Sequence, residues 1–213
     1  MIEDKILHFE GLLRKSRRST GAEFTDLQLE QLKHYYGLVL KWNTRLHLTT
    51  LTDPFQFFHR HIFESDFAET FISSQVEQIW DLGTGLGVPG IPLAILRPDL
   101  AINLIESKRG KVIFLEEVIS ALRLSNAKVI ESRIESLHDL PMNSCLIARA
   151  VEQMEDVVSE MLVLGKNCRQ IIVMAAEELA KTLRFNSPAN SKLQIETIPR
   201  SDRKFVVICL SFT

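Results

Sequence analysis

Apolar residues in the first 78 positions recur three or four residues apart, a spacing that places them on one face of a helix. One such stripe runs from Ile2 to Leu13, a second follows Thr25, and a third follows Asp53. Thr25 stands three residues before a glutamine, as in a capping box, and Asp53 stands before a proline, which suits the first turn of a helix. The pattern predicts a helical region over residues 1–78.

From about residue 79 onward, short apolar runs alternate with amphipathic stripes. The runs predict strands at 79–83, 101–106, 127–131, 144–148, 170–175, 192–198 and 205–212. The stripes predict helices at 89–96, 108–124 and 152–164. This alternation is typical of a mostly parallel sheet with helices on both faces. The last two strands have no helix between them and predict an antiparallel edge. We therefore expect an α/β, Rossmann-like domain over 79–213, packed as one unit with the helical region.

A glycine-rich turn joins the first predicted strand to its helix, in the sequence I-W-D-L-G-T-G-L-G-V-P-G at 79–90. Gly83, Gly85 and Gly87 alternate with larger residues, and Gly90 follows. Glycine adopts backbone angles that side chains forbid, and it lets a ligand lie against the main chain. The turn is therefore the leading candidate for a ligand-binding loop.

Two ligands fit this loop. Gly85, Gly87 and Gly90 match the G-x-G-x-x-G pattern of dinucleotide sites, which place a pyrophosphate at the helix N-terminus. The pattern D-x-G-x-G-x-G, which begins at Asp81, favours S-adenosylmethionine (SAM) instead, because a carboxylate attracts its ammonium and sulfonium groups and repels a pyrophosphate. SAM is the preferred ligand, and an NAD-dependent oxidoreductase remains an alternative.

The other candidate residues follow the next three strands, because ligands of such sheets bind beyond the carboxyl ends of the strands. Glu106 ends the second strand, where a carboxylate can accept both hydroxyls of an adenosine ribose. Ile134 and Glu135 follow the third strand and could flank an adenine. Arg149 ends the fourth strand, where it either pairs with Glu106 or Asp81 or faces a cofactor or a phosphate.

Composition restricts the partners of the chain. Its 213 residues carry a formal net charge of −2, so any binding to nucleic acid requires a local basic patch. The cluster Arg14, Lys15, Arg17 and Arg18 is one candidate. Three widely spaced cysteines, without a C-x-x-C pair, argue against a zinc site. The apolar runs are too short for a membrane span or a signal peptide. We expect a cytoplasmic protein without a metal.

The end of the fourth strand bears on the reaction. It lacks the Asn-Pro-Pro-Tyr type motif with which many SAM-dependent enzymes methylate exocyclic amines. A ring nitrogen with an in-plane lone pair, such as N7 of guanine, has no proton to lose and needs no general base. Alignment of the nucleophile with the methyl group then suffices. No catalytic side chain is therefore assigned.

The chain resembles the bacterial glucose-inhibited division protein B family of 16S ribosomal RNA (rRNA) guanine-N7 methyltransferases. The matching stretches are K-W-N-T-R-L-H-L-T-T at 41–50, D-P-F-Q-F-F-H-R-H-I-F-E-S at 53–65, D-L-G-T-G-L-G-V-P-G-I-P-L-A-I at 81–95, K-V-I-F-L-E-E-V at 111–118, S-R-I-E-S at 132–136 and A-R-A at 148–150. The resemblance implies SAM as cofactor and 16S rRNA or the small ribosomal subunit as partner. It implies cofactor contacts at Gly83, Val88, Ile134, Glu135 and Arg149. Candidate phosphate contacts are Arg14, Lys15, Arg17, Arg18, Arg200, Arg203 and Lys204.

Three departures from the family pattern motivate an alternative function. His47 stands in place of an asparagine, Ala175 in place of a lysine after the fifth strand, and Val151 in place of an aromatic residue. The missing lysine and aromatic residue could weaken RNA binding or base positioning, while the cofactor loop is intact. The alternative is a catalytically weakened RNA-binding or ribosome-assembly factor. In either case we expect a monomer.

Overall fold

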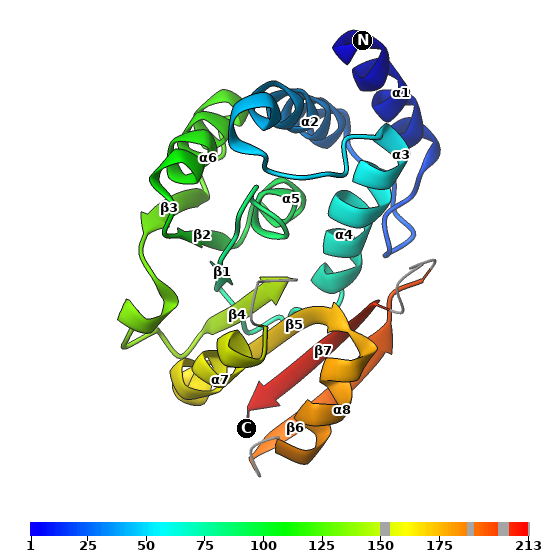
Figure 1. Ribbon diagram of the computed structural model, residues 1–213. Helices are drawn as coiled ribbons and strands as arrows, with labels where there is room; N and C mark the ends of the chain where they lie inside the picture. Colours follow the sequence, from blue (N-terminus) through cyan, green and yellow to red (C-terminus); the bar gives the residue numbers. More distant parts are fainter. Residues whose placement is uncertain (150–153, 187–189, 200–204, 213) are drawn as a thin grey trace.

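The computed structural model describes residues 1–149, 154–186, 190–199 and 205–212. In this part of the chain seven strands form one sheet in the order β3-β2-β1-β4-β5-β7-β6 (Figure 1). The strands are β1 (Gln78–Leu82), β2 (Ala101–Glu106), β3 (Ala127–Glu131), β4 (Ser144–Arg149), β5 (Gln170–Ala176), β6 (Ser191–Thr197) and β7 (Phe205–Phe212). Strands β1 to β5 pair in parallel, and β7 is antiparallel to both β5 and β6. The predicted parallel sheet with an antiparallel edge is confirmed.

Helices cover both faces of the sheet (Figure 1). The helices that precede the first strand in the sequence are α1 (Ile2–Lys15), α2 (Asp26–Leu46), α3 (Pro54–Phe57), a π-helix (Phe58–Phe63) and α4 (Glu64–Glu69). Those that follow β1 are α5 (Gly90–Leu96), α6 (Arg109–Leu122), α7 (Met154–Leu164) and α8 (Glu177–Asn186), with 3-10 turns at Ile134–Ser136 and Gly165–Asn167. Helix α8 was not expected from the sequence, and the predicted third helix is divided by the π-helix.

Two apolar cores form because successive side chains of a strand point to opposite faces. In β4, Cys145 and Ile147 join the core with α1, α2, α5 and α6, whereas Leu146 and Ala148 join the core with α7 and α8. Both faces of β4 are therefore buried. This explains why its sequence is a continuous apolar run rather than an alternating one.

The N-terminal helices pack directly against the elements around the glycine loop. The rings of Phe9 and Phe57 lie 4.5 and 4.7 Å from that of Tyr36, between centroids, and form the centre of the helical region. The hydroxyl of Tyr35 donates a 2.8 Å hydrogen bond to the carbonyl of Leu86 in the loop. In the described residues no helix is both long and apolar enough to cross a membrane.

The cap of α2 offers a test of local helix chemistry. The Oγ1 of Thr25 accepts the amide of Gln28 at 3.3 Å, and the Gln28 side chain accepts the amide of Thr25 at 3.0 Å. Thr25→Ala is expected to lower the free energy of unfolding by about 1 kcal/mol in urea denaturation. The control is Thr44→Ala, because Thr44 lies exposed inside the same helix and alanine has the higher helix propensity. Equal losses in the two variants would contradict the capping role.

Candidate functional site

A pocket of about 550 Å³ opens at the carboxyl ends of β1, β2 and β4. This is the place where the chain order of the sheet reverses, between β1 and β4, and where open α/β sheets bind ligands. The pocket brings together many of the residues expected from the sequence: Gly83, Gly85, Val88, Glu106, Ile134, Glu135 and Arg149. Asp81 and Gly87 are not in its wall.

The glycines of the loop have different tasks. Gly83, Gly85 and Gly87 have φ angles of 65°, 62° and 99°, in the left-handed region that side chains disfavour. A Cβ on Gly85 would meet its nearest atoms only at 3.9 Å, so this residue borders open space in the pocket. A Cβ on Gly87 would lie 2.5 Å from Cγ1 of Ile91 in α5 and 3.0 Å from Cδ2 of Leu115 in α6, so Gly87 allows the loop to pack closely on both helices.

Asp81 lies behind the loop rather than in the pocket wall. Its side chain is completely buried, and its Oδ2 accepts hydrogen bonds from the Thr84 hydroxyl and, at 2.8 Å, from the Gly90 amide. Among the described residues its Oδ1 has no partner. Burial raises the pKa of Asp81 to about 6, against the two hydrogen bonds, which lower it. The expectation that Asp81 lines the ligand site is corrected, because its carboxylate holds the two ends of the loop together.

Glu106 supports the same loop from β2. Its carboxylate accepts the Gly85 amide at 3.2 Å and the Lys108 amide at 2.8 Å, and it remains in the pocket wall. Helix α6 has Lys108 as its N-cap, and the Lys108 side chain does not cap the helix. The carboxylate of Glu106 takes over that role for the Lys108 amide.

Arg149 pairs with neither of its expected partners. Its Nη2 lies 2.7 Å from Oε2 of Glu64 and donates at 2.6 Å to the Arg60 carbonyl. Burial lowers the pKa of the Arg149 guanidinium, and the Glu64 carboxylate opposes that shift. Glu64 was not among the residues expected from the sequence. The available signal was an acid on the buried side of a helix, in the run F-H-R-H-I-F-E-S.

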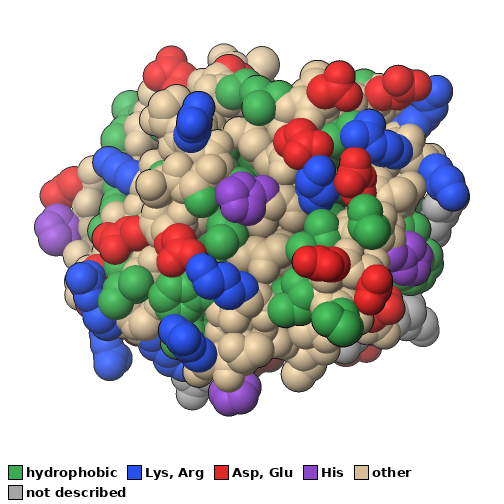
Figure 2. Space-filling view, turned by 90° about the horizontal axis from the view of Figure 1, so that it is seen from above, with side chains coloured by type: hydrophobic (Ala, Val, Ile, Leu, Met, Phe, Trp, Pro, Cys, Tyr) green, Lys and Arg blue, Asp and Glu red, His purple; other side chains and the backbone are tan. Residues whose placement is uncertain are grey.

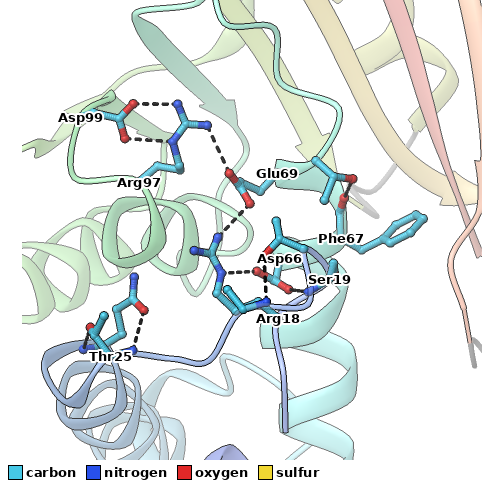
Figure 3. Close-up of polar contacts among 12 residues, drawn as sticks. Arg18, Ser19, Thr25, Asp66, Phe67, Glu69, Arg97 and Asp99 are labelled. Atoms are coloured by element: carbon cyan, nitrogen blue, oxygen red, sulfur yellow. Dashed lines mark hydrogen bonds and ion pairs between the residues drawn. The ribbon is translucent and has the colours of Figure 1, made fainter.

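The candidate phosphate contacts divide into two groups. Arg14 and Arg17 lie at the surface, each paired with a glutamate, and Lys15 is exposed. Arg18 is instead held inside by Asp66 at 2.9 Å and Glu69 at 2.8 Å (Figure 3). Its guanidinium connects the segment after α1 to α4, so Arg18 has a structural role, which corrects its assignment as a phosphate contact. On the face shown in Figure 2, Lys and Arg side chains lie among Asp and Glu side chains.

Some of the residues named from the sequence lie outside the described part of the chain or away from the pocket. Arg200, Arg203, Lys204 and Val151 lie outside the described residues. Ala175 is buried in β5, where it pairs with Val206 of β7.

Comparison with known proteins identifies relatives over most of the chain. The model of a family described as GidB, rRNA small subunit methyltransferase G, matches residues 28–204. A protein named ribosomal RNA small subunit methyltransferase G from Ectopseudomonas mendocina is 36% identical over 70% of this chain and 69% of its own length. The protein of that name from Escherichia coli O1:K1 is 37% identical over 67% of this chain and 68% of its own length.

Solved structures share the architecture at low sequence identity. A precorrin-6y C5,15-methyltransferase from Geobacter metallireducens superposes with a TM-score of 0.53 at 15% identity, covering 70% of this chain and 87% of its own. The METTL16 methyltransferase domain gives a TM-score of 0.54 at 13% identity, covering 100% of this chain and 90% of its own. The expected methyltransferase-type Rossmann-like fold is thereby confirmed.

Proposed function

The chain belongs to the rRNA small subunit methyltransferase G family, and we propose that it transfers a methyl group from SAM to N7 of a guanine in 16S rRNA. The observation that carries the proposal is the pocket at the strand ends, where the glycine loop, Glu106 and Arg149 meet. The printed names of the relatives support rRNA as the substrate. The choice of N7 rests on the absence of an amine-methylating motif after β4.

The residues present fit SAM. Gly85 leaves space for a ligand against the backbone, and the Glu106 carboxylate and the Arg149 guanidinium line the same pocket. Glu106 would accept the ribose hydroxyls, Ile134 would cover the adenine, and Arg149 would bind the carboxylate of the amino-acid end. Bound there, SAM supplies a methyl group on a positively charged sulfur.

The protein's own contribution is then to orient the base and exclude water. N7 of guanine attacks through its lone pair and loses no proton, so no side chain has to act as a base. This agrees with a pocket in which Glu106 is already engaged by two backbone amides. The names of the relatives favour methyl transfer over both nicotinamide chemistry and a non-catalytic assembly factor.

We also propose that residues 1–78 form the helical region that approaches the RNA, with Arg14, Lys15 and Arg17 at its surface. The partner is the small ribosomal subunit or its 16S rRNA. The protein would therefore act in the cytoplasm.

Methyl transfer is tested directly with tritiated SAM and two substrates, 30S subunits and naked 16S rRNA, both prepared from cells without this modification. We expect label in at least one of them. The methylated ring carries a positive charge and opens after borohydride reduction, so aniline treatment should then cleave the RNA at the labelled guanine. Label in neither RNA would contradict the function, and label without cleavage would contradict N7 as the target.

Glu106→Gln is expected to weaken the binding of S-adenosylhomocysteine. Hydrogen bonds to a charged group contribute about 1.5–3 kcal/mol, so the dissociation constant measured by calorimetry should rise about 10- to 100-fold. The matched control is Glu131→Gln at the end of the neighbouring β3, because Glu131 is partly exposed and pairs with Arg109. If both variants bind as the wild-type protein does, Glu106 does not hold the ribose.

A further inference from the structure

The guanidinium of Arg149 is held from a helix that precedes the sheet. Both Nε and Nη2 of Arg149 donate to Oε2 of Glu64, at 3.2 and 2.7 Å. The Glu64 side chain is 2% exposed, and its other oxygen lies 3.2 Å from Nε of Arg60. A single buried carboxylate therefore faces two guanidinium groups.

The π-helix contributes a second acceptor to the same guanidinium. In an α-helix the amide of Glu64 would bond to the carbonyl of Arg60, four residues earlier. Here it bonds to the carbonyl of His59, five residues earlier. The Arg60 carbonyl, which the Glu64 amide does not use, accepts Nη2 of Arg149 at 2.6 Å. Short π-helical segments are rare and occur often at functional sites.

These contacts leave one edge of the guanidinium for a ligand. Arginine has five N–H donors, of which two belong to Nη1. In the described part of the chain Nη1 makes no hydrogen bond. It is not fully buried either, so it remains accessible to a ligand. Since Arg149 lines the pocket, the Nη1 edge is the accessible one. The ring of Phe205 lies 5.7 Å from the guanidinium carbon and supports the group from another side.

We propose that Glu64 is a positioning residue, which holds Arg149 so that its free edge binds the carboxylate of the cofactor's amino-acid end. The inference rests on the proposed function and adds a residue outside the pocket wall. A planar guanidinium recognises a carboxylate only when its plane is fixed. Without the negative charge of Glu64, the two positive guanidinium groups of Arg149 and Arg60 repel each other. The Arg149 guanidinium then turns away from the ligand.

The test compares Glu64→Gln with Asp66→Asn, using two ligands. Both acids are buried in α4 and each pairs with an arginine, but Asp66 holds Arg18, which is not in the pocket wall. S-adenosylhomocysteine carries the amino-acid carboxylate, and 5′-methylthioadenosine lacks it. Glu64→Gln is expected to weaken S-adenosylhomocysteine binding by about tenfold or more and to leave methylthioadenosine binding unchanged. In steady-state assays the KM for SAM should rise with little change in kcat. Asp66→Asn should lower the melting temperature without this ligand selectivity.

The outcomes separate the inference from the proposed function. Equal weakening of both ligands by Glu64→Gln, or the same selectivity in Asp66→Asn, would overturn the positioning role. Wild-type protein that binds neither ligand would overturn the proposed function, and the role of Glu64 with it. If Glu64→Gln does not fold, Glu64→Asp must show the selective loss, because it keeps the charge and shortens its reach. Unchanged binding in that variant would also overturn the role.

Discussion

Gly90→Ala is expected to destabilise the protein and to abolish cofactor binding. A Cβ at this position would overlap Cδ2 of Leu104 and would lie 2.6 Å from Oδ2 of Asp81. Both neighbours are completely buried, so neither can move aside into solvent. Forcing extra volume into a packed core costs about 1–3 kcal/mol and sometimes more. The displaced Asp81 would also lose its 2.8 Å bond to the Gly90 amide, which fixes the loop.

Two further glycines provide controls for this variant. Gly85→Ala places a Cβ at ordinary contact distances of 3.9 Å but at a φ of 62°, so only its backbone conformation should cost stability, by about 1–2 kcal/mol. Gly11→Ala adds a Cβ in α1 with nothing within 4 Å and should stabilise the helix by about 0.5–1 kcal/mol. Urea denaturation measures all three variants. If Gly90→Ala is as stable as the wild-type protein, the loop can shift to make room for the added methyl group, and the prediction is wrong.

Asp81→Asn is expected to gain stability relative to the wild-type protein as the pH rises. Burial raises the pKa of Asp81 from 3.8 to about 6, so ionisation is easier in the unfolded chain. The wild-type protein therefore loses stability between pH 4 and pH 6, by up to about 3 kcal/mol for a shift of about two units. Asparagine does not ionise, so the variant lacks this loss. Well below pH 3.8 the carboxyl is protonated in both states, and the stability difference between the variant and the wild-type protein no longer changes with pH.

The measurement is the free energy of unfolding of both proteins at a series of pH values from 4 to 7. Asp99→Asn serves as a control of opposite sign, because the hydrogen bond from Arg97 holds the pKa of Asp99 below its usual value. The ionised Asp99 side chain therefore stabilises the fold at pH values above the usual pKa of an aspartate. The Asp99→Asn variant should not gain stability relative to the wild-type protein as the pH rises. A constant difference between Asp81→Asn and the wild-type protein would mean that Asp81 ionises normally.

Much of the candidate site follows from local sequence. Ala101–Glu106, Ala127–Glu131 and Phe205–Phe212 are strands with the bounds that their apolar runs predict. Because parallel strands end at one edge of the sheet, locating these strands also places Glu106 and Ile134 near the glycine loop. Helix α8 has four apolar residues among its ten, a share close to that of α1, so the sequence carried its amphipathic pattern although no helix was expected there.

Sequence alone therefore determined the places of the strands along the chain, the glycine loop and the strand ends that surround the pocket, because each depends on neighbours within a few residues. The tertiary structure decided how the buried charges pair. Arg149 meets Glu64 across 85 positions of sequence, and Arg18 meets Asp66 across 48. A buried charge must find an opposite charge or a hydrogen bond wherever packing brings one. Which partner a buried charge finds depends on the whole fold. Only the tertiary structure therefore decided the direction of the Asp81 side chain, the partner of Arg149 and the interior position of Arg18.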